Sequence, residues 1–226
     1  MKKTLKIILS AMLLCCVLFV LASCGDDDKG AQDNGGANGD GAADNGGGSD
    51  SGEPAEPEAK SFLKKAETGE RNNYNGSVGY EILAIEDMQV SAVGRPVSGS
   101  MEQSHTIYIW EVSTETLMAS ATITPDSPTD ALGFKTAKLD GQILFQAGEY
   151  YRIVSAEYED GDMWYDIGTA AEDPIPDLQP NAEAEISTPV FTGADAHDSY
   201  PGNTYNPGGI RGYTGLTFYY LPPAAG

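Results

Sequence analysis

The chain has 226 residues, with 34 Asp and Glu against 13 Lys and Arg, and its formal net charge at pH 7 is −21. This charge argues against nucleic acid, anionic lipid headgroups and wall polyanions as direct ligands, and it leaves neutral or cationic partners. The length suffices for one domain with a hydrophobic core in addition to terminal segments.

The N-terminus has the layout of a secretory signal peptide. Lys2, Lys3 and Lys6 precede an apolar run that begins near Ile7 and ends at Ala22. A transmembrane helix is the alternative, but it needs about 20 apolar residues, and this run is shorter. The pattern therefore favours a segment that is removed during secretion.

The end of the apolar run, Leu21-Ala22-Ser23-Cys24, resembles the lipobox of bacterial lipoproteins. The resemblance implies that residues 1–23 are removed and that Cys24 carries a thioether-linked diacylglycerol. We therefore expect an extracytoplasmic protein anchored to the bacterial membrane or cell surface, because two acyl chains give stable anchoring. Cys15 and Cys16 lie in the removed segment, so the mature domain is expected to have no disulfide, thiolate metal site or cysteine nucleophile.

Residues 24–58 form a low-complexity segment rich in Gly, Asp, Asn and Ala. Apart from Ala it has almost no apolar side chain, so burial cannot offset the entropy that ordering would cost. We predict a disordered acidic linker that gives reach to a domain over residues 59–226.

The domain shows the alternation of apolar and polar residues that is typical of β-strands. We expect strands over residues 78–84, 90–93, 105–112, 117–123, 132–139, 143–145, 150–158, 184–191 and 216–221. Both faces of residues 105–112 are apolar, which predicts a central strand. Short turns at regular spacing favour an all-β fold, a two-sheet antiparallel β-sandwich of jelly-roll type.

Two segments depart from this pattern. Residues 61–66 are the one expected helix, a turn or two long. Residues 192–214 are rich in Gly, Asn, Pro and Tyr and predict a long loop. Loops of this length inside a compact domain are often functional.

Several short motifs occur in order between residues 71 and 220. They are Arg71-Asn72-Asn73-Tyr74-Asn75-Gly76, Val78-Gly79-Tyr80, Ala92-Val93-Gly94-Arg95, His105 with Ile107-Tyr108-Ile109-Trp110, Ala147-Gly148-Glu149-Tyr150-Tyr151, Gly161-Asp162-Met163-Trp164-Tyr165-Asp166 and Phe218-Tyr219-Tyr220. Together they resemble a β-sandwich module of unassigned function, found in secreted and surface bacterial proteins and often beside glycan-active domains. The chain departs from the module at Ser77, where the module has a bulky aromatic residue, and at residues 205–209. The resemblance implies a fold and a setting but no activity.

Residues 159–166 contain the main candidate ligand site. Sugars present apolar C–H faces rimmed by hydroxyls, so Trp164 and Tyr165 offer stacking platforms while Asp162 and Asp166 offer hydrogen-bond acceptors. In the alternative interpretation, Trp164 caps the end of the sandwich core and the two aspartates satisfy loop amides.

Calcium is the one cofactor that the residues suggest. Glu159, Asp160, Asp162 and Asp166 supply hard oxygen ligands at close spacing, which suits this ion.

Arg71, Asn73 and Tyr205 complete the candidate ligand contacts. Arg71 and Asn73 offer donors to a glycan, and in the alternative Arg71 pairs with a carboxylate and pins the first loop. Tyr205 belongs to the long loop, whose Tyr and Asn residues suit ligand contact or packing of the loop itself.

Catalytic motifs are not evident. His105 and His197 are the only histidines, and no nucleophile elbow, phosphate loop or zinc-binding spacing occurs. We therefore expect a non-catalytic, lipid-anchored β-sandwich that binds a neutral glycan or another envelope or extracellular ligand. The alternatives are a structural or protein-interaction module of the cell envelope and, third, a carbohydrate-active hydrolase or lyase.

Overall fold

The computed structural model describes residues 58–166, 177–205 and 211–221. These residues belong to one compact unit that spans Gly52–Gly226. The expected signal peptide and residues 24–57 of the expected linker lie outside the described residues. In the described part, no helix is long and apolar enough to cross a membrane.

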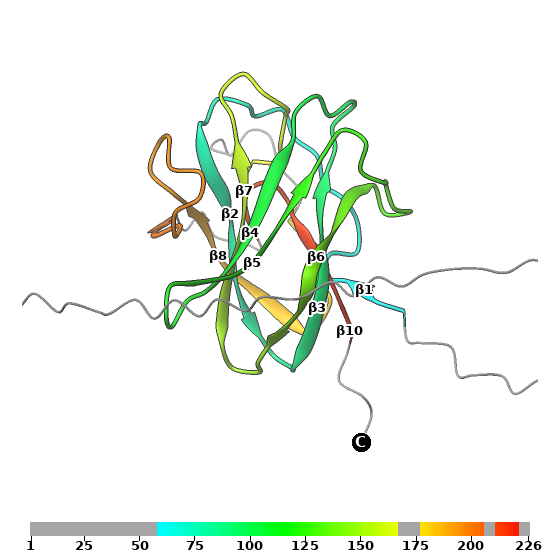
Figure 1. Ribbon diagram of the computed structural model, residues 1–226, viewed down its shortest axis with the longest axis vertical. Coiled ribbons are helices and arrows are strands. Elements are labelled where there is room, and N and C mark those ends of the chain that lie inside the picture. Colours follow the sequence, from blue (N-terminus) through cyan, green and yellow to red (C-terminus); the bar gives the residue numbers. More distant parts are fainter. Residues whose placement is uncertain (1–57, 167–176, 206–210, 222–226) are drawn as a thin grey trace, which may run out of the picture. The chain divides into compact units, whose positions relative to one another are not determined.

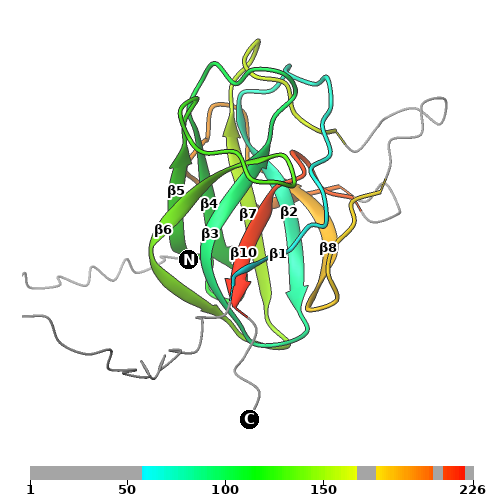
Figure 2. The same ribbon diagram turned by 90° about the vertical axis from the view of Figure 1, so that its right-hand side faces the viewer.

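Two antiparallel β-sheets pack face to face (Figures 1 and 2). The four-stranded sheet has the order β1-β10-β3-β6, formed by Lys60–Ser61, Thr217–Leu221, Met88–Pro96 and Phe134–Phe145. The six-stranded sheet has the order β5-β4-β7-β2-β8-β9, formed by Thr116–Ile123, His105–Glu111, Tyr150–Glu157, Gly76–Ala84, Ala184–Phe191 and Asn203–Thr204. The prediction of an all-β, two-sheet antiparallel sandwich is confirmed.

The core lies between the sheets and is rich in aromatic rings. Phe145 of β6 and Tyr151 of β7 stack at 4.0 Å between ring centres, which joins the two sheets directly. Phe62 stacks on Phe218 at 4.6 Å. Such aromatic pairs contribute about 0.5–1.5 kcal/mol each beyond the burial of their area. The alternation of the strands thus produces one continuous interior.

The prediction of a helix over residues 61–66 is wrong. Lys60 and Ser61 instead form β1, which pairs with Tyr220 and Tyr219 of β10. The next two residues, Phe62 and Leu63, are fully buried. Burial of these side chains against the sheets outweighs the weak local preference for a helical turn.

The two strands expected over residues 132–139 and 143–145 are a single strand, β6. Its pairing with β3 shifts between Ala92↔Lys138 and Val90↔Ile143, so residues 139–142 lie opposite Ser91 alone. The turn expected at Asp140 and Gly141 is therefore a bulge, which absorbs extra residues while the strand pairing resumes on the far side.

The long loop folds back onto the outer face of the six-stranded sheet. Tyr200 makes an edge contact with Trp110 at 5.9 Å, and the Arg152 guanidinium lies 4.9 Å from the centre of the Tyr200 ring. The covered strand β4 lies between β5 and β7, in agreement with the central position expected for it. Coverage by the loop explains why both faces of β4 are apolar.

Candidate functional site

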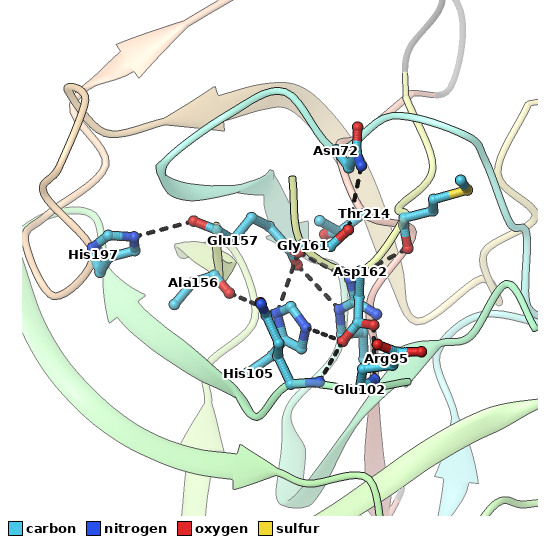
Figure 3. Close-up of polar contacts among 12 residues, drawn as sticks. Asn72, Arg95, Glu102, His105, Ala156, Glu157, Gly161, Asp162, His197 and Thr214 are labelled. Carbon is cyan, nitrogen blue, oxygen red and sulfur yellow. Dashed lines mark hydrogen bonds and ion pairs between the residues drawn. The ribbon is translucent and has the colours of Figure 1, made fainter. Parts of the chain in front are cut away.

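Four charged side chains meet inside the sandwich where β3 and β7 end and β4 begins (Figure 3). We call Arg95, His105, Glu157 and Asp162 the buried network. Arg95 comes from the four-stranded sheet, His105 and Glu157 come from the six-stranded sheet, and Asp162 follows β7. A buried charge is costly unless it is paired, so the geometry of these contacts decides what the network can do.

Arg95 and Glu157 form the centre of the buried network. The Arg95 Nε donates to Glu157 Oε1 at 3.1 Å, and Nη2 donates to Oε2 at 2.9 Å. The two side chains are 1% and 0% exposed. Such a two-pronged, charge-assisted pair is strong and geometrically specific, so it links β3 to β7 across the interior.

His105 is enclosed by acceptors. Its Nδ1 lies 2.8 Å from the Ala156 carbonyl oxygen and 3.2 Å from Glu157 Oε2, and its Nε2 lies 2.9 Å from Asp162 Oδ2. Burial disfavours the charged ring, but the carboxylates of Glu157 and Asp162 outweigh this effect and raise the pKa of His105. When the ring is protonated, both nitrogens donate to these acceptors, and the imidazolium balances the second carboxylate of the network.

Asp162 links the loop that follows β7 to the loop that precedes β4. Its Oδ1 accepts the Glu102 amide at 2.8 Å, and its Oδ2 accepts the Gln103 amide at 2.9 Å in addition to His105. Burial acts to raise the pKa of Asp162, but these hydrogen bonds and the histidine charge lower it overall. Burial likewise opposes ionisation of Glu157, whose pKa is lowered by Arg95 and His105. Asp162 thus satisfies loop amides, as in the alternative interpretation of its role.

Both histidines of the chain contact acceptors within the protein. His105 is fully buried, and each of its ring nitrogens contacts an acceptor. The second histidine, His197, contacts Asn75 Oδ1 at 3.0 Å and the Glu157 carbonyl oxygen at 3.1 Å through Nε2. These contacts link strands and loops at this end of the sandwich.

Four of the predicted ligand contacts converge at a second place. We define the Arg71 cluster as Arg71, Asn73, Trp164, Asp166 and Tyr213. The Arg71 Nε donates to Asn73 Oδ1 at 2.8 Å, and Nη1 donates to Asp166 Oδ1 at 3.0 Å. The guanidinium carbon lies 4.9 Å from the Trp164 ring centre and 5.9 Å from that of Tyr213. Arg71 therefore pairs with a carboxylate, Asp166, as in the alternative interpretation, and the same side chain also holds Asn73.

Trp164 and Tyr165 are not open stacking platforms. Their exposed fractions are 2% and 1%. Trp164 packs with Val78 and meets Tyr213 edge to face at 5.9 Å, while Arg71 lies over its ring. Stacking of a ligand on Trp164 therefore does not fit this structure, and the alternative in which Trp164 caps the core does. The cause is cover supplied by Arg71 and Tyr213, which are distant in sequence.

The calcium site expected among the carboxylates of residues 159–166 does not form. Glu159 and Asp160 are exposed, Asp162 is committed to two amides and His105, and Asp166 pairs with Arg71. Within residues 58–166, 177–205 and 211–221, no group of three or more His, Cys, Asp or Glu could hold a metal ion. Partners within the protein therefore already engage Asp162 and Asp166, two of the four carboxylates that a calcium cage would need.

Tyr205 lies beside β8 and is 48% exposed. Its backbone amide donates to the Pro189 carbonyl at 3.2 Å, and its carbonyl accepts the Thr188 hydroxyl at 3.1 Å. The Tyr205 side chain is therefore exposed, and these two hydrogen bonds hold the residue in place through its backbone.

The sequence interpretation missed Glu157. The inward positions of β7 are Tyr151, Ile153 and Ser155, and Glu157 continues this alternation at the end of the strand. A carboxylate at an inward strand position predicts a buried ion pair, because a buried carboxylate needs a cation beside it. The structure identifies the buried Arg95 as the cation that pairs with Glu157.

These observations define the class of protein as a two-sheet antiparallel β-sandwich whose two sheets are joined inside by a buried network of Arg95, His105, Glu157 and Asp162. No protein-family model matches the chain, and no curated protein matches it.

Proposed function

We propose that this chain is a bacterial lipoprotein, anchored outside the membrane through Cys24, whose β-sandwich binds a neutral glycan or another extracellular ligand without catalysis. The observation that carries the proposal is the convergence of Arg71, Asn73 and Asp166 in one partly exposed cluster. The Arg71 side chain is 30% exposed, that of Asp166 is 18% exposed, and Asn73 is exposed.

Recognition in this proposal depends on hydrogen bonds to hydroxyl groups. Arg71 and Asn73 carry planar, multi-donor groups at the surface, and Asp166 orients Arg71. Trp164 supports Arg71 from beneath, because the attraction between the cation and the ring helps to hold the guanidinium over it. A polar group that is already oriented loses less entropy on binding, which favours affinity for a neutral ligand.

The ligand-binding part is tested with the full chain in detergent on an array of neutral oligosaccharides. Arg71→Gln is expected to weaken binding at least tenfold, and Asn73→Ala to weaken it severalfold, with melting temperatures within a few degrees of the parent. Lys64→Gln, at an exposed position, serves as the matched charge control. A parent protein that binds no oligosaccharide on the array contradicts the proposal.

The anchoring part is tested by metabolic labelling with radioactive palmitate. Label in the parent and its loss in Cys24→Ala are expected, together with release of the variant from the membrane fraction. Cys16→Ala is the matched control and should keep the label. Labelling that persists in Cys24→Ala contradicts the assignment.

A second candidate function is assembly through a sheet edge. Strand β5, Thr116–Ile123, has no charged residue, and Leu117 on it is 41% exposed. It pairs with β4 and ends the order of the six-stranded sheet. An uncharged edge strand is a template for strand addition, and a second copy of the chain would extend the sheet. Sedimentation equilibrium tests this candidate: a dimer that Ser120→Lys dissociates supports it, and a monomeric parent contradicts it.

A further inference from the structure

A groove of about 700 Å³ lies on the four-stranded sheet, the sheet labelled β6, β3, β10 and β1 in Figure 2. Its lining comes from three strands, β3, β6 and β10, from the loop that precedes β6, and from Ala59. Its volume falls in the range of about 300–1,000 Å³ that is usual for small-molecule sites. None of the residues predicted as ligand contacts is among its lining residues.

Small side chains and the bulge of β6 shape the groove. Ser91, Ala92 and Ala137 line it. Because these residues are small, the surface of the sheet is recessed here. Beside them, residues 139–142 bulge opposite Ser91 because β6 has extra residues there. Leu139 and Gln142, at the two ends of the bulge, also line the groove. A bulge of this kind bends its strand and redirects its side chains, which provides one wall.

Tyr219 is the aromatic residue of the groove, and its orientation is fixed. Its hydroxyl donates to Asp130 Oδ2 at 2.6 Å. The other oxygen of Asp130 accepts the amides of Leu132 at 2.9 Å and Phe134 at 2.8 Å. Burial and the Asp130 carboxylate raise the pKa of Tyr219, so its hydroxyl stays a donor. The ring is therefore held in place before any ligand arrives.

The loop that forms the second wall is also held. Lys135 Nζ donates to the carbonyls of Pro125 at 2.6 Å and Ser127 at 2.8 Å. The Thr136 amide donates to the Pro128 carbonyl at 2.9 Å. These bonds attach the loop to β6, so binding in the groove need not order it. Such preorganisation distinguishes a built site from a gap between surface side chains.

The chemistry of the lining indicates the ligand class. Its charged residues are one carboxylate, Asp130, and one ammonium, Lys138, so the groove has no net charge in a chain of −21. The Tyr219 ring, Ala92 and Pro128 offer apolar surface, and Thr136, Lys138 and Gln142 offer hydrogen-bonding groups beside it. Apolar surface next to neutral polar groups matches a sugar ring, which has C–H faces rimmed by hydroxyls.

We propose that this groove binds a segment of a neutral glycan, with a sugar ring stacked on Tyr219 and its hydroxyls bonded to Thr136, Lys138 and Gln142. The inference rests on the proposed function for its ligand class, and it assigns a site separate from the Arg71 cluster. The glycan lies on the four-stranded sheet, whereas Arg71 lies over Trp164, which packs with Val78 of β2 in the six-stranded sheet.

The experiment titrates the full chain in detergent with the neutral oligosaccharide that binds best on the array. Tyr219→Ala is expected to weaken binding at least tenfold, and Tyr219→Phe, which keeps the ring, at most threefold. Gln142→Ala together with Thr136→Ala should weaken binding at least fivefold. This pair keeps the inference testable if Tyr219→Ala fails to fold, because Gln142 is exposed and Thr136 half-buried. Tyr150→Ala, which removes a tyrosine that is 41% exposed outside the groove, is the matched control and should bind like the parent.

The outcomes separate the two proposals. Loss of affinity in the groove variants alone supports the groove and removes the Arg71 cluster as the site. Loss in both sets of variants supports two sites. Loss in Arg71→Gln alone overturns the groove and leaves the proposed function standing. Binding of peptides in place of every oligosaccharide overturns both, as does a parent that binds none of the array.

Discussion

Arg95 of β3 and Glu157 of β7 form a two-pronged ion pair across the interior of the sandwich, with Nε–Oε1 and Nη2–Oε2 distances of 3.1 and 2.9 Å. The two residues are 62 positions apart in the chain and belong to different sheets. The ion pair is therefore a direct polar link between the two sheets, at the end of the sandwich where β3 and β7 end and β4 begins.

Removal of the Glu157 charge should be strongly destabilising. Glu157→Gln leaves Arg95 and His105 buried beside a neutral amide, and loss of one partner of a buried pair costs about 3–5 kcal/mol. Urea unfolding followed by circular dichroism measures the loss. Glu159→Gln changes an exposed carboxylate of the same chemistry and should leave the midpoint almost unchanged. Equal midpoints for the two variants would show that the ion pair contributes nothing to stability.

The buried network should contribute most to stability between about pH 4.5 and 6.5. The pKa of His105 is raised above its ordinary value of 6.5, so its contribution is full below pH 6.5 and is lost as the pH rises through the folded-state pKa. The pKa values of Glu157 and Asp162 are lowered from 4.5 and 3.8. Their contributions are full above those values and are lost as the pH falls through the folded-state pKa values.

The measurement is the free energy of unfolding of the parent and of His105→Gln at several pH values from 4.5 to 10. The difference between the two proteins should be largest at the acidic end and should shrink as the pH rises. A difference that stays constant, or grows towards alkaline pH, would contradict an imidazolium in the folded protein.

Trp164 should behave as a core residue. It is 2% exposed and Trp110 is 8% exposed, and these are the only two tryptophans of the chain. We expect blue-shifted emission and weak quenching by acrylamide. Trp164→Ala should lower the free energy of unfolding by about 3–5 kcal/mol, the usual cost of truncating a buried aromatic side chain. Tyr205→Ala, at an exposed ring, should have little effect. Strong acrylamide quenching of Trp110→Phe, in which Trp164 is the remaining tryptophan, would contradict its burial.

Gly79 should not tolerate a side chain. A Cβ built at this position of β2 lies 1.9 Å from the Ile153 carbonyl oxygen and 2.7 Å from the Val154 Cα, so the backbones of β2 and β7 would have to separate. Gly79→Ala should cost about 3 kcal/mol or more, at the upper end for overpacking. Gly141→Ala is the matched control, because a Cβ there meets nothing within 4 Å. Similar melting temperatures for the two variants would contradict this close approach.

The strands were largely predictable because alternation is a local property. β8 was expected over residues 184–191 and occurs as Ala184–Phe191, and β5 differs from its prediction by one residue at its start. A strand with one covered face repeats its apolar residues at every second position, whatever the rest of the chain does. β1 and the bulge of β6 could not be predicted in this way, because pairing partners far along the chain determine both.

Local composition and alternation thus determined the all-β class, most strand positions and the polar and aromatic character of residues 159–166. Only the tertiary structure decided what those residues do. Arg71 lies over Trp164, and Asp162 bonds to amides and to His105, so an expected binding surface is covered. The physical reason is that exposure and pairing depend on which distant segments meet. Residue identity specifies the groups that are present, and the packing of two sheets specifies which of them still face the solvent.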